Sequence, residues 1–157
     1  MEGVNLEGVS LMNISLSYAN LSKANLNGAI LIGVVLDGVN FERATLVDAD
    51  LRASRLCAAN FCMANLENAD LRGAHLGGGD FYLQQRNGAN FTKANLTGAD
   101  LRGAFIQGSE KPQGYKGAVF KNTILKGVLL DCLNCSNNKN TKKQVKQILK
   151  NLGAEVF

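Results

Sequence analysis

Apolar side chains recur every five residues along most of this chain. In steps of five from Leu6 to Ile106, 20 of the 21 positions hold Leu, Phe or Ile, and Arg86 is the exception. Two residues before each of these, 18 of 21 positions hold Ala, Val or Ile. A step of five suits neither a helix, where it turns the side chain by about 140°, nor a strand, where it alternates faces. The chain must therefore turn after every pentad and wind into a coil.

A slower period sets the cross-section of that coil. Phe41, Phe61 and Phe81 lie 20 residues apart, and every other central position from Leu6 to Leu76 is Leu. Four pentads per coil would stack these rings in one column at about 4.8 Å. The polar residues just before them should form a second column, bonded to turn backbone and to neighbouring coils: Asn20, Asn40, Asn60, Asp80 and Asp100. We predict an all-β solenoid of about six coils, each contacting only its neighbours.

The pattern first fails near residue 86. Gln84 and Arg86 fall on inward positions, although the phase of five is the same on both sides of them. Either the chain bulges outward between Tyr82 and Asn87, or Leu83 fills the core in place of Arg86. The bulge is favoured because burying an unpaired arginine is very costly.

The second half of the chain adds a loop and a cap. Residues 107–117 hold the only proline and break the period, so we predict a loop insertion within a β-helix spanning 1–133. Residues 134–157 should form a linker and a helix over about 141–152, where apolar residues recur with helical spacing. That helix would cap the open core. The first coil has no such cover, so we expect a longer parent chain or an interface there, such as a homodimer joined through the uncapped N-terminal end.

Several pentads share one motif, Ala-(Asn/Asp)-Leu-X-X. It is seen in Ala24-Asn25-Leu26, Ala64-Asn65-Leu66, Ala94-Asn95-Leu96 and Ala99-Asp100-Leu101. Over about residues 3–130 the sequence resembles the pentapeptide-repeat family, in the style of its cyanobacterial members. The resemblance implies a right-handed quadrilateral β-helix. It also brings in a function, since some members are rod-like mimics of duplex DNA that bind gyrase.

Charge is divided unevenly along the chain. Residues 1–106 carry 8 Lys or Arg against 10 Asp or Glu, a balance of −2, whereas residues 107–157 carry 9 Lys against 3 acids, a balance of +6. A DNA mimic needs a dense negative surface that imitates phosphates. Inhibition or protection of DNA gyrase is therefore the alternative function, and the leading one is a non-enzymatic scaffold that binds an unidentified protein.

The chemistry-bearing residues do not form a catalytic pattern. Cys132 and Cys135 lack the second ligand pair of a zinc site, and His75 should point outward. Cys57 and Cys62 should be surface thiols. We expect no enzyme activity, metal or cofactor, and a cytoplasmic protein, because neither a signal peptide nor a span of about 20 apolar residues is present.

Four residues in two places form the candidate interaction surface. Tyr82 and Arg86 lie at the first break, where an irregular segment on a rigid scaffold can carry recognition. Arg52 and Arg72 stack 20 residues apart, and with Lys93 nearby they make a basic strip too short for nucleic-acid binding. Asp50 and Asp70 look like ladder residues and not like an acid/base pair.

Overall fold

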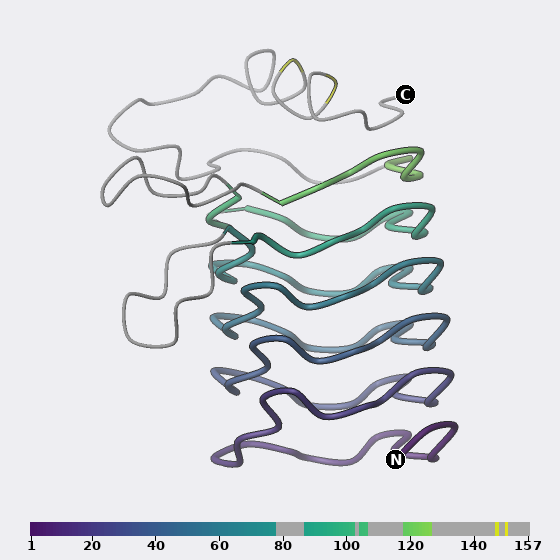
Figure 1. Ribbon diagram of the computed structural model, residues 1–157, viewed down its shortest axis with the longest axis vertical. Helices are drawn as coiled ribbons and strands as arrows, with labels where there is room; N and C mark the ends of the chain where they lie inside the picture. Colours follow the sequence, from purple (N-terminus) through teal and green to yellow (C-terminus); the bar gives the residue numbers. More distant parts are fainter. Residues whose placement is uncertain (78–86, 103, 107–117, 127–146, 148–149, 151–157) are drawn as a thin grey trace.

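The computed structural model shows a stack of coils that rises from the N-terminus (Figure 1). It describes residues 1–77, 87–102, 104–106 and 118–126, together with residues 147 and 150. Each pentad supplies one short side of a coil, and its backbone pairs through a single parallel bridge rather than through an extended strand. Four sides complete one coil, since Asn5 bridges Asn25, and Asn25 bridges Thr45. The predicted coil of four pentads is confirmed.

A tight turn joins each side to the next. The small residue that ends the turn donates its N–H to the central residue three positions earlier, as Ala29 does to Leu26 at 3.0 Å. The third residue of the turn has a positive φ, as in a type II turn. This position is not reserved for glycine, since Gly28 has a φ of 63° and Arg43 one of 58°. Because one such turn follows each pentad, the chain bends every five residues.

Four columns of bridged residues define the sides, which we number in chain order. Side 1 carries Asn5, Asn25, Thr45, Asn65, Asn95 and Ile124; side 2 carries Ser10, Ile30, Asp50, Asp70 and Asp100; side 3 carries Ser15, Val35, Arg55, His75 and Phe105; side 4 carries Asn20, Asn40, Asn60, Asn90 and Val119. Their backbones are joined from coil to coil, with Leu6 donating to Asn25 at 2.7 Å and Asn25 to Val4 at 2.9 Å.

A column of phenylalanine rings fills one quarter of the core. Phe41 and Phe61 stack with centroids 4.8 Å apart, as predicted, but the next ring is Phe91, also at 4.8 Å, followed by Phe120 at 5.1 Å. The prediction that Phe81 belongs to this column is wrong. Asn60 bridges Asn90, 30 residues on instead of 20, so ten extra residues leave the stack between them. Ten is a multiple of five, which is why the sequence shows no change of phase.

This longer excursion also shifts the polar columns. Asp100 lies on side 2 above Asp70 and not on side 4, where Asn90 and Val119 follow Asn60. The first break is therefore more than a bulge between Tyr82 and Asn87. Tyr82, Leu83 and Arg86 themselves lie outside the described residues, so the prediction that Arg86 reaches solvent stays a prediction.

The ladder of asparagines behaves as predicted. The Oδ1 of Asn60 accepts the N–H of Cys62 at 3.1 Å, and the Nδ2 of Asn60 donates to Asn40 at 3.0 Å. On side 4 the amides of Asn40, Asn60 and Asn90 each accept a hydrogen bond from the turn that follows and donate one to the coil below.

The two ends of the chain differ in how much is described. In the first coil Val9 and Ile14 are 39% and 42% exposed, against 0–1% for the small core positions of the later coils. At the other end, Gln147 and Lys150 are helical, and the rest of the predicted helix over 141–152 lies outside the described residues. Its role as a cap remains a prediction, as does the N-terminal dimer.

Candidate functional site

Side 3 lacks the asparagines and aspartates that line the other sides. No described residue in its column is Asn or Asp, whereas sides 1, 2 and 4 each carry at least three. The amide or carboxylate elsewhere accepts the N–H two residues later and so holds the turn. Among the described residues of side 3 no such side chain accepts this N–H. The outward positions of the column are occupied instead by residues of other types, among them Arg55, His75 and Phe105.

A buried carboxylate replaces the missing ladder at Arg55. Asp37, in the turn of the coil below, is 0% exposed, and its Oδ1 accepts the N–H of Cys57 at 3.0 Å. Its Oδ2 accepts a hydrogen bond from Nη2 of Arg55 at 2.7 Å. This ion pair is partly desolvated, since the Arg55 side chain is 41% exposed. Asp37 therefore fixes the Cys57 turn and compensates the charge of Arg55 at once.

His75 and Phe105 continue the column above Arg55. Their rings stack with centroids 4.4 Å apart and planes inclined by 10°. Desolvation, together with the charge of Arg55, lowers the pKa of His75 against the opposite effect of Asp37. His75 is exposed, as predicted, and its lowered pKa favours the neutral imidazole at pH 7.

The turn that follows side 3 is where the chain leaves the stack twice, and we call it the departure corner. Ala89 donates to the carbonyl of Leu76 at 2.6 Å, and Ala118 to that of Ile106 at 2.7 Å. In an uninterrupted coil the same bond joins Ala59 to Leu56, three residues apart, at 3.1 Å. Both excursions thus begin and end at one corner of successive coils, where two breaks of the coloured trace lie along one edge (Figure 1).

Tyr18 lies at the same corner in the first coil. Its ring packs against Gly38, where an added Cβ would come within 2.7 Å of Cδ1 of Tyr18. The sequence of the two excursions contains the other two tyrosines, Tyr82 and Tyr115. Among the described residues, side 3 and the departure corner thus bring together Arg55, His75, Phe105 and Tyr18, whose residue types are common in protein recognition. The sequence signal for this surface is that positions 55, 75 and 105 hold residues other than Asn or Asp.

The predicted basic strip is not present in the form expected. Arg52 and Arg72 do stack on side 2, but the next member of the column is Arg102, whereas Lys93 lies beyond side 4. Each arginine donates Nε and Nη2 to the aspartate two residues before it. Arg52 also lies 3.6 Å from Asp70, and Arg72 3.6 Å from Asp100.

These contacts explain the protonation of the side 2 ladder. Burial acts to raise the pKa of Asp70, but the hydrogen bonds and charge of Arg72 outweigh it and lower that pKa. Side 2 is consequently a column of ion pairs in which the charges neutralise one another. The contacts of Arg52 with Asp70 and of Arg72 with Asp100 connect successive coils. Asp50 and Asp70 are ladder residues, as predicted.

The two described thiols differ in their surroundings. Cys57 is only 5% exposed, contrary to the prediction of a surface thiol, because its side chain turns inward and donates to the carbonyl of Gly77 at 3.1 Å. Burial, reinforced by the nearby Asp37 carboxylate, raises the pKa of Cys57 to about 11. Cys62 is half-buried. Among the described residues no group of Cys, His, Asp and Glu could hold a metal ion, and no helix there is long and apolar enough to cross a membrane.

Comparisons with known proteins agree with this architecture. A family model described as a pentapeptide repeat region matches residues 4–81, and one described as pentapeptide repeats of eight copies matches residues 87–109. A search of curated proteins gives no match.

Solved structures of pentapeptide repeat proteins are similar to this chain in fold. The chain is similar to a pentapeptide repeat protein, Rfr23, from the cyanobacterium Cyanothece 51142, with 29% identity, a TM-score of 0.58 and coverage of 82% of this chain and 85% of that one. A pentapeptide repeat protein from the Arabidopsis thaliana thylakoid lumen is 22% identical, with a TM-score of 0.52 and coverage of 92% and 88%. The bridged columns, the five-residue turns and these matches together assign the chain to the pentapeptide-repeat family, to which it belongs.

Proposed function

We propose that this protein is a non-enzymatic, cytoplasmic scaffold that binds another protein through side 3 and the departure corner. The observation that carries the proposal is that two irregular features of the repeat lie next to each other. The one side without Asn or Asp among its described bridged residues is followed by the corner at which both long excursions open.

The residue types on this surface support protein recognition. Arginine, histidine and aromatic side chains provide large contact areas, and tyrosine and arginine are enriched at the energetic centres of interfaces. Here Arg55, His75 and Phe105 follow one another in adjacent coils, on a backbone whose bridges hold them rigidly. A rigid platform lowers the entropy cost of binding.

The charge of the surface points to a protein rather than a nucleic acid. Asp37 compensates the charge of Arg55, and the lowered pKa of His75 favours its neutral form, so the described part of side 3 carries little net charge at pH 7. Nucleic-acid binding depends instead on several uncompensated cations.

Restoring the repeat on side 3 tests the proposal. The double variant His75→Asn/Phe105→Asn places at both positions the residue that the other sides use, so we expect a folded protein with unchanged thermal unfolding. It should lose a partner that the wild type captures from cell extract, and purified partner should bind the variant at least tenfold more weakly.

A matched control comes from side 2. Ile30 occupies an equivalent bridged position and is 37% exposed, so Ile30→Asn makes the same kind of change on another surface. This variant should retain the partner. Equal binding by the side 3 variant and the wild type would remove the proposal.

Binding to gyrase as a DNA mimic is the weaker proposal. The carboxylates of Asp50, Asp70 and Asp100, which would have to imitate phosphates, each accept hydrogen bonds from an arginine of the same coil. A supercoiling assay separates the two functions, and we expect neither inhibition nor protection of gyrase at micromolar protein.

A further inference from the structure

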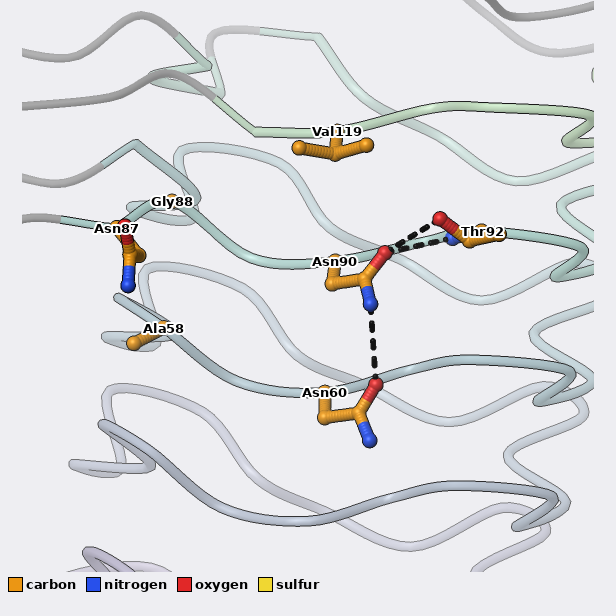
Figure 2. A pocket seen from close by; sticks show the side chains of 7 residues that line it. All are labelled: Ala58, Asn60, Asn87, Gly88, Asn90, Thr92 and Val119. Atoms are coloured by element: carbon orange, nitrogen blue, oxygen red, sulfur yellow. Dashed lines mark hydrogen bonds between the residues drawn. The ribbon is translucent and has the colours of Figure 1, made fainter.

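A hollow of about 480 Å³ lies on side 4, directly beside the departure corner (Figure 2). Its lining combines amide groups with small and apolar side chains: Ala58, Asn60, Asn87, Gly88, Asn90, Thr92 and Val119. Gly88 and Asn87 belong to the point where the first excursion returns to the stack. None of the lining residues is charged.

The amides of Asn60 and Asn90 are held in fixed orientations. The Oδ1 of Asn90 accepts the N–H of Thr92 at 3.0 Å and its hydroxyl at 2.7 Å. The Nδ2 of Asn90 donates one hydrogen to Asn60 at 3.4 Å, as the dashed lines in Figure 2 show. An amide nitrogen carries two hydrogens, so one donor of Asn90 remains for a ligand.

Two other lining residues, Asn87 and Val119, are exposed to solvent in the hollow. Asn87 is exposed, and its side chain makes no hydrogen bond to any other described residue. Val119 takes the place of an asparagine at the top of the column and is 42% exposed. The hollow thus combines amide groups with separate apolar side chains, Val119 on the coil above Asn90 and Ala58 on a coil below Asn87 (Figure 2).

We propose that this hollow is a subsite for a tyrosine side chain of a protein partner. The inference rests on the proposed scaffold function and names the anchor that the surface takes. The ring would pack against Val119, and the hydroxyl would meet the remaining amide hydrogen of Asn90, with the Asn87 amide at the edge of the same hollow.

Other anchors fit the lining less well. A charged side chain would lose hydration without meeting a countercharge among the lining residues. A purely apolar ring would remove from water the remaining hydrogen of the Asn90 amide and the Asn87 amide without giving them a hydrogen-bond partner. A hydroxyl at the end of an aromatic ring satisfies both parts.

The test uses free amino-acid amides with the full chain, so it needs no partner. In an NMR titration, N-acetyl-tyrosine amide should shift the side-chain amide signals of Asn87 and Asn90 with a Kd of about 1–10 mM, as expected for so small a ligand. N-acetyl-phenylalanine amide should bind at least fivefold more weakly, and N-acetyl-glutamate amide should give no saturable shift. Equal binding of the tyrosine and phenylalanine probes, or no binding of either, would overturn the proposal.

Two variants locate the binding. Val119→Lys places a charge in the hollow and should abolish the tyrosine shifts, whereas Ile124→Lys, at the equivalent position of side 1 and 43% exposed, should leave them unchanged. Shifts that survive Val119→Lys would show that the probe binds elsewhere. If the hollow binds the tyrosine probe but the side 3 variant still captures the partner, the scaffold surface is wrong and the subsite stands on its own.

Discussion

The Oδ2 of Asp37 lies 2.7 Å from Nη2 of Arg55, in the coil above, although the Asp37 side chain is fully buried and the guanidinium is partly in water. This pair replaces an asparagine ladder step on side 3. Because the carboxylate is buried and the guanidinium is not, the cost of changing Arg55 depends on whether Asp37 is changed as well.

We predict that Arg55→Gln destabilises the protein more than the double variant Asp37→Asn/Arg55→Gln. The single change leaves a buried carboxylate whose one remaining hydrogen-bond donor among the described residues is the Cys57 N–H, at a cost of about 3 kcal/mol in unfolding free energy. The double change removes the charge and keeps an acceptor for that N–H, so about half of the loss should be recovered. Urea unfolding at pH 7 measures both, and a double variant no more stable than Arg55→Gln would contradict the account.

Stability should depend on pH through His75. The folded-state pKa of His75 is lowered, so the unfolded chain binds more protons and stability falls as pH drops below about 6.5. Unfolding free energies at pH 7.5 and 5.5 should differ in the wild type, while His75→Asn should remove most of the difference. The interval lies above the range in which carboxylates with lowered pKa values titrate.

The phenylalanine column should be sensitive in its middle. Phe61 stacks on Phe41 below and Phe91 above, so Phe61→Ala opens a cavity between two rings and should cost about 3–5 kcal/mol. Phe61→Leu restores the residue used at other central positions and should cost much less. Thermal or urea unfolding distinguishes them. Similar losses for both would mean that ring stacking, more than volume, sets the stability.

Alkylation should separate the two described cysteines. A pKa near 11 leaves the Cys57 thiolate about a hundredfold rarer than at a pKa of 9, and the side chain is buried besides. Iodoacetamide at pH 8 followed by peptide mass mapping should therefore label Cys62 in the native protein and Cys57 only after urea is added. Rapid native labelling of Cys57 would show that its corner opens readily.

The sequence predicts the repeat far better than it predicts the positions around the breaks. Phe41 and Phe61 are placed correctly because only intact pentads separate them. Phe81 is exchanged for Phe91 because an insertion of ten residues keeps the phase of five, so no local signal marks it. The error then carries forward, and it put Asp100 on the wrong side.

The candidate site shows a second limit. Residues just after the central position usually face solvent, so the burial of Asp37 and Cys57 could not be predicted from the period. Asp37 and Cys57 are held by contacts between neighbouring coils, because the Asp37 carboxylate accepts hydrogen bonds from Arg55, 18 residues later, and from the Cys57 N–H, 20 residues later. Similarly, the sequence predicts a basic strip at Arg52 and Arg72 because their pairing with Asp50 and Asp70 depends on side-chain conformation.

The hydrogen bond that closes each turn has a consequence for how such a protein can diversify. At the departure corner the bond forms whether its partners are three residues apart, as for Leu56 and Ala59, or thirteen, as for Leu76 and Ala89. Lengthening a flexible connection costs only about 0.6 kcal/mol per doubling. A new segment inserted after Cys57 would therefore be tolerated by the stack, and this corner can acquire or lose sequence without a change in the rest of the solenoid.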